Sequence, residues 1–114
     1  MDKAIARSIK IKTGVLKRSV KDFTYFREEA KQLEEKVDKL KADEVDEYDI
    51  NKQTQVMQES LDLLPDCKNK IESALEDLKG LVEDYEDTEE YKESDEGQNA
   101  NGIIAEASEF IETI

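Results

Sequence analysis

The stretch that decides the fold runs from Ile5 to Leu40 and reads IARSIKIKTGVLKRSVKDFTYFREEAKQLEEKVDKL. Apolar side chains recur in it at intervals of seven, in two rows offset by three positions. The rows are Ile9, Leu16, Phe23, Ala30 and Val37, and Ile5, Phe26, Leu33 and Leu40. Such rows make one apolar stripe, which predicts a single long helix over about residues 3–41. Lys12 and Ser19 interrupt the second row. We therefore expect the N-terminal third to be packed less tightly than the remainder.

A further row of apolar residues, C-terminal to this stripe, predicts a second long helix. It consists of Ile50, Met57, Leu64, Ile71, Leu78 and Tyr85. Asp49 is well placed to cap its start, because its carboxylate can accept from the first free backbone N–H groups. The row keeps its spacing across Pro65, which favours one helix over about residues 49–87 with a kink at the proline. The alternative is a turn at residues 64–66, with Asp66 capping a further helix.

The C-terminal part is expected to hold an exposed linker and a short helix. Residues 88–100 are acidic and then rich in Gly and Asn, which is typical of a connection. Asn101 can cap a helix over about residues 101–113, in which Ile103, Ala107, Phe110 and Ile114 step by four, three and four. We therefore expect an all-α fold, an elongated antiparallel three-helix bundle that forms a single domain over residues 1–114.

Charge is abundant and unevenly distributed. Charged residues make up 41% of the chain and the formal net charge is −13. Residues 1–21 nevertheless hold seven Lys or Arg against a single acid, Asp2. This basic end can steer an acidic protein surface toward it, whereas the overall negative charge argues against nucleic acid as a partner.

The residues needed for common catalytic and metal sites are missing. The chain has no histidine, and Cys67 is its only cysteine, so it has neither an imidazole base nor an internal disulfide. The acidic run at residues 43–49 lacks the central glycine and alternating ligands of a calcium loop. We expect no enzymatic activity, no cofactor and no metal. Neither a signal peptide nor a membrane span is visible, so we expect a cytoplasmic protein.

Several uncommon blocks carry a family resemblance. They are Ile9-Lys10-Ile11-Lys12-Thr13-Gly14-Val15-Leu16-Lys17-Arg18, Tyr48-Asp49-Ile50 with Lys52-Gln53, Gln58-Glu59-Ser60, and Leu64-Pro65-Asp66-Cys67. In order and spacing they resemble the tubulin-binding cofactor A family, over about residues 7–93. The resemblance implies a helical chaperone that captures β-tubulin folding intermediates for assembly of the αβ heterodimer, and that meets the other tubulin-folding cofactors indirectly.

The matched polar positions are the candidate partner-binding residues that the resemblance implies. They are Lys10, Lys12, Lys17, Arg18, Tyr48, Asp49, Gln58, Glu59 and Asp66. The apolar rows fit a monomer or a homodimer. Two other classes stay open: a coiled-coil scaffold or assembly subunit without a chaperone role, and a nucleic-acid accessory protein that uses the basic end.

Overall fold

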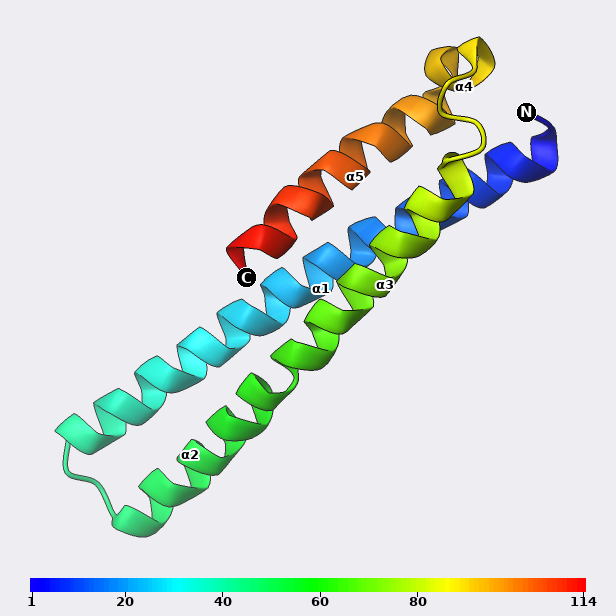
Figure 1. Ribbon diagram of the computed structural model, residues 1–114. Coiled ribbons are helices and arrows are strands. Elements are labelled where there is room, and N and C mark those ends of the chain that lie inside the picture. Colours follow the sequence, from blue (N-terminus) through cyan, green and yellow to red (C-terminus); the bar gives the residue numbers. More distant parts are fainter. The chain divides into compact units, whose positions relative to one another are not determined.

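The computed structural model describes all residues 1–114, which form helices and no strand (Figure 1). The helices are α1 (Lys3–Ala42), α2 (Glu47–Asp62), α3 (Leu64–Val82), α4 (Glu89–Glu93) and α5 (Asp95–Thr113). Two compact units can be distinguished: unit 1 comprises Met1–Lys21 and Lys68–Ile114, and unit 2 comprises Asp22–Cys67. The all-α class is confirmed, whereas the single domain stays a prediction.

Unit 1 is a bundle of three helices. The first half of α1, most of α3, and α5 lie side by side, and α3 runs opposite to the other two (Figure 1). This confirms the antiparallel three-helix arrangement. The side chains buried here are Ile9, Leu16, Ile71, Ala74, Leu75, Leu78, Val82, Tyr91, Ala100 and Ala107, together with Thr13. The expectation of a poorly sealed N-terminal third is wrong, because α5 supplies a third side to the core.

Unit 2 is a hairpin made of the second half of α1 and of α2 (Figure 1). The first apolar row of α1 is buried here, with Phe23 at 5%, Ala30 at 2% and Val37 at 2% exposure. The second row is only half-buried at Phe26, Leu33 and Leu40. Two helices can cover only one side of each other, so one apolar row stays partly open to solvent.

The turn between α1 and α2 is closed by backbone hydrogen bonds. Val45 N–H donates to the Leu40 carbonyl at 3.3 Å, and Glu44 N–H donates to the Lys41 carbonyl at 3.2 Å. These two bonds make a Schellman motif, which requires a left-handed residue after the helix. That residue is Glu44, with φ 52°. A side chain at this position strains the backbone, because Cβ crowds the carbonyl oxygen.

Glu44→Gly is expected to raise the free energy of unfolding by about 1 kcal/mol, since glycine adopts the left-handed conformation without steric strain. Urea unfolding followed by circular dichroism measures the change. Asp43→Gly is the matched control, because Asp43 precedes the left-handed residue and has no positive φ. A Glu44→Gly protein no more stable than Asp43→Gly would contradict this account of the turn.

The expected helix over residues 49–87 is wrong in its bounds and its continuity. α2 begins at Glu47, because Asp46 caps it by accepting from Tyr48 N–H at 3.0 Å, and Asp49 lies in the first turn. The helix is interrupted at Leu63, whose backbone stays right-handed (φ −74°, ψ −25°). Pro65 lies in the first turn of α3, where its missing N–H has no intrahelical acceptor to lose. Asp66 lies in that turn too and is not its cap.

The expected exposed linker over residues 88–100 is also wrong. α3 ends at Val82, and the short helix α4 is capped by Thr88, whose Oγ1 accepts from Tyr91 N–H at 3.2 Å. Ser94, and not Asn101, caps the last helix, which begins at Asp95. Gly97, the one glycine of this segment, lies within α5. Packing of α5 within unit 1, with Ala100 fully buried, overrides the low helix propensity of Gly and Asn.

Candidate partner-binding surface

The four basic candidates on α1 do not share one face. Lys10 and Lys17 are seven residues apart, which returns almost to the same side of a helix, since each residue turns it by about 100°. Arg18 points about 100° away from Lys17 and is exposed. Lys12 is half-buried. The basic end of the chain therefore divides between at least two surfaces.

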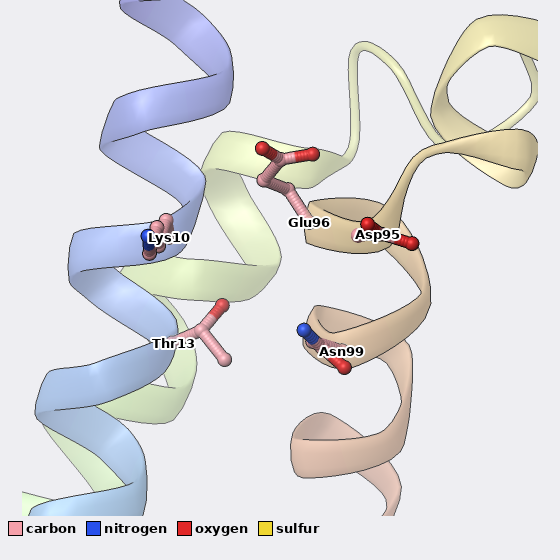
Figure 2. A pocket seen from close by; sticks show the side chains of 5 residues that line it. All are labelled: Lys10, Thr13, Asp95, Glu96 and Asn99. Carbon is pink, nitrogen blue, oxygen red and sulfur yellow. The ribbon is translucent and has the colours of Figure 1, made fainter.

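The side with Lys10 and Lys17 faces α5. A cleft of about 320 Å³ separates the two helices and is lined by Lys10, Thr13, Asp95, Glu96 and Asn99. Figure 2 shows Lys10 and Thr13 on α1 across from the three α5 side chains. Farther along the same helices, a smaller cleft is lined by Lys17, Val20, Lys21, Ile103, Glu106 and Ala107. Cations of α1 and carboxylates of α5 thus line the same clefts.

Thr13 contributes no free polar group to this cleft. Its hydroxyl donates to the Ile9 carbonyl at 2.7 Å within α1, and the side chain is buried. Of the other four lining residues, Lys10, Asp95 and Asn99 are exposed and Glu96 is half-buried. The cleft is therefore a charged, hydrated surface, and it has no orphaned buried group that a small ligand would have to satisfy.

The side with Arg18 is open and partly apolar. Ile11 is 57% exposed and Val15 is 47% exposed, one helical turn apart. A groove of about 380 Å³ adjoins them between α1 and α3, lined by Val15, Ser19, Asn69, Lys70, Ser73, Ala74 and Asp77. Ile11 lies outside both apolar rows of α1, so an exposed apolar contact was not predicted there. The signal in the sequence was an isoleucine that is flanked by two lysines and lies outside the apolar stripe, which favours an exposed position.

The remaining five candidates belong to unit 2 and are all exposed: Tyr48, Asp49, Gln58, Glu59 and Asp66. Tyr48 is 68% exposed, and the Lys52 ammonium lies 5.8 Å from its ring centroid. Tyr48 and Glu59 are eleven residues apart and share a face of α2, whereas Asp49 and Gln58 point to opposite sides. Gln58 is engaged locally, since its amide donates to Asp62 Oδ1 at 2.9 Å.

Exposed apolar residues accompany the Tyr48 face. Val56 and Leu63 are seven residues apart and are 42% and 47% exposed. Large aliphatic and aromatic side chains that remain in solvent among charges are a common feature of protein-binding surfaces. No set of three or more acidic, cysteine or histidine side chains is arranged to hold a metal ion. No helix has the length and apolar character to cross a membrane.

The chain matches the family model of tubulin binding cofactor A over residues 4–104. It is 48% identical over 91 residues to human tubulin-specific chaperone A, which covers 77% of this chain and 84% of the human protein. The crystal structure of tubulin folding cofactor A from Arabidopsis thaliana superimposes with a TM-score of 0.86 at 35% identity, covering 95% of this chain and 99% of that one.

A second solved structure, of a β-tubulin binding post-chaperonin cofactor, gives a TM-score of 0.78 at 34% identity and covers 92% of this chain and 98% of that one. The similarity to these proteins, in sequence and in fold, therefore extends over most of this chain and most of each relative. The helices, the exposed faces and these similarities together establish that the chain belongs to the tubulin binding cofactor A family of tubulin-folding chaperones.

Proposed function

We propose that this protein captures β-tubulin folding intermediates and holds them for assembly of the αβ heterodimer. The observation that carries the proposal is the open face of unit 1, where Ile11 and Val15 are exposed beside Arg18. Family membership supports the choice of tubulin, and one structural relative is a β-tubulin binding post-chaperonin cofactor. We further propose that it acts in the cytoplasm, as a monomer or homodimer, and meets other tubulin-folding cofactors indirectly.

The open face suits a folding intermediate. An incompletely assembled subunit exposes apolar surface that would otherwise be buried against its partner, and such surface aggregates. Ile11 and Val15 can cover a small part of it, while the flanking charges keep the complex in solution. Arg18 adds attraction to an acidic partner, which accelerates encounter and weakens as salt rises. Tyr48 and Glu59 of unit 2, with Val56 and Leu63, offer a second contact of the same kind.

The direct test is a pull-down with monomeric β-tubulin released from the cytosolic chaperonin, with the native αβ dimer as the control. Selective retention of free β-tubulin supports the proposal. Equal retention of the dimer would indicate a general tubulin binder, and no retention even at low salt would contradict capture altogether.

Reversing charge at two positions, Lys17→Glu with Arg18→Glu, is expected to weaken β-tubulin binding roughly tenfold at low salt, because like charges then meet across the interface. The effect should shrink as salt rises. Lys36→Glu with Lys39→Glu makes the same charge change at exposed positions elsewhere on α1. Helicity by circular dichroism should be unchanged in both proteins. Unaltered affinity in the first variant would rule out the basic end as a contact.

The single variants then separate the two sides of α1. Arg18 lies on the open face, whereas Lys17 lines a cleft against α5. Arg18→Glu alone should account for most of the loss, and Lys17→Glu alone for little of it. Equal losses would mean that β-tubulin also reaches the α5 side.

A further inference from the structure

We propose that the side of α1 bearing Lys10, Lys17 and Lys21, the basic stripe, is a latent binding surface for an acidic helix of a partner. In the free protein α5 occupies this surface and keeps it closed. The three lysines follow one another at seven and four residues, so they lie on one side of α1. All three line clefts whose opposite wall is α5.

The charges of α5 show which chemistry the surface accepts. Asp95 and Glu96 lie across the first cleft from Lys10, as Figure 2 shows, and Glu106 lines the second cleft with Lys17 and Lys21. The same flank of α5 thus presents a carboxylate wherever α1 presents an ammonium group. A partner helix that replaces α5 must carry acidic residues with this spacing.

The buried positions of α5 are occupied by small residues. Gly97, Ala100 and Ala107 are the buried residues of α5, and they recur at three and seven along one side. Small side chains let two helices approach closely but remove little apolar surface from water. The larger residues of α5 are half-buried: Ile103, Ile104, Phe110 and Ile111. α5 thus fits closely within unit 1 while none of its large side chains is fully buried, which favours its displacement over that of α1 or α3.

The electrostatic part is weak as well. Neither cleft contains a direct ion pair between its lysines and its carboxylates, so the attraction acts through water and is screened by salt. α5 nevertheless occupies the basic stripe in the free protein, because a tethered segment has an effective concentration of roughly millimolar. A free helix of similar affinity at micromolar concentration cannot compete until α5 is loosened.

The test uses the full-length protein and a fluorescent peptide of residues 94–114 as the acidic helical probe, with binding followed by anisotropy at low and high salt. The variant Glu96→Lys with Glu106→Lys repels α5 from the stripe. The control, Glu109→Lys with Glu112→Lys, changes the same charge on the same helix at exposed positions that line neither cleft. The first variant should bind the peptide at least tenfold tighter than the control, and only at low salt.

Hydrogen exchange supplies a second readout on the same proteins. Amides of residues 95–113 should exchange at least tenfold faster in the first variant than in the control, while those of α3 keep their protection. Equal peptide affinity in the two variants, or α5 protection unchanged from the original protein, would overturn the proposal. If the lysine variant loses helicity, Glu96→Gln with Glu106→Gln repeats both measurements without charge reversal. Because the measurement uses a peptide and no tubulin, its outcome does not depend on whether the protein captures β-tubulin.

Discussion

Tyr91→Ala is expected to lower the free energy of unfolding by about 4 kcal/mol, in the range for removing a buried aromatic side chain. Tyr91 is 0% exposed and is the largest fully buried side chain of the protein. Its hydroxyl donates to Asn101 Oδ1 at 2.9 Å, which links α4 to α5. Chemical denaturation measures the loss. A change below about 1 kcal/mol, the scale of an exposed-site substitution, would mean that Tyr91 is not a core residue.

Tyr91→Phe separates the two contributions of this side chain. It keeps the buried ring and removes only the hydrogen bond, so the loss should be about 1 kcal/mol. It also leaves Asn101 able to bond water, because Asn101 is exposed. A loss as large as that of Tyr91→Ala would assign the stabilisation to the hydroxyl and not to packing.

The Tyr91 hydroxyl also makes stability depend on alkaline pH. Burial raises the pKa of Tyr91 above its ordinary value of 10.0, and the nearby negative charge of Glu86 raises it further. The pKa of Tyr91 is therefore higher in the folded protein than in the unfolded chain. The contribution of the Tyr91 hydroxyl to the free energy of unfolding is fully present below pH 10, and it is lost as pH rises through the pKa of the folded protein. The stability difference between the original protein and Tyr91→Phe should therefore shrink above pH 10.

Gly97→Ala is expected to destabilise the protein by about 3 kcal/mol, because the added methyl group has no room. A Cβ at this position would lie 2.1 Å from the Tyr91 carbonyl oxygen and 2.9 Å from Ser94 Oγ. Both atoms are held in place: Ser94 Oγ donates to the Tyr91 carbonyl at 2.8 Å and accepts from Gly97 N–H at 3.0 Å. The substitution must therefore break the cap of α5 or move the backbone of α4.

Gly102→Ala is the matched control within the same helix. A Cβ there meets nothing within 4 Å, so alanine should stabilise α5 by up to about 1 kcal/mol through its higher helix propensity. The two glycine substitutions should thus change stability in opposite directions, as measured by urea unfolding. If both were stabilising, the close approach between α4 and α5 would not exist in solution.

This α4–α5 corner connects stability to the proposed binding surfaces. Ser94 determines that α5 begins at Asp95, which places Asp95 and Glu96 beside Lys10. A helix that began at Asn101, as the sequence suggested, would have left Lys10 open to solvent. The register of α5 therefore decides whether the basic end of α1 is a free docking face or a covered one.

Much of the helical pattern could be read from the sequence because it is local. The rows of Ile9 and Ile50 repeat at seven, and α1 was expected over residues 3–41 and is observed over Lys3–Ala42. At Pro65 the sequence favoured a kink within one helix and left a turn as the alternative, whereas the structure interrupts the helix at Leu63. The position of this interruption depends on how the last turn of α2 closes, with Leu63 N–H donating to the Ser60 carbonyl at 3.3 Å.

The last helix could not be read in the same way. Residues 94–102 combine Ser, Gly, Gln and Asn with acids, and their intrinsic preference for a helix is low. They are helical because Gly97 and Ala100 fit closely within unit 1, and no local pattern contains that information. The same reason explains Tyr91, which lies in an acidic run typical of exposed chain and is nevertheless fully buried.

By itself, the sequence determined the all-α class, the apolar rows, the basic end and the family, since each is a property of residue order and helical period. The tertiary structure alone decided that Lys10 and Lys17 line clefts against α5 while Ile11, Val15 and Arg18 stay open. The physical reason is distance along the chain. A helical period places a side chain on a face, but the residues that cover that face lie nearly ninety positions away, and only the packing of the folded chain brings them there.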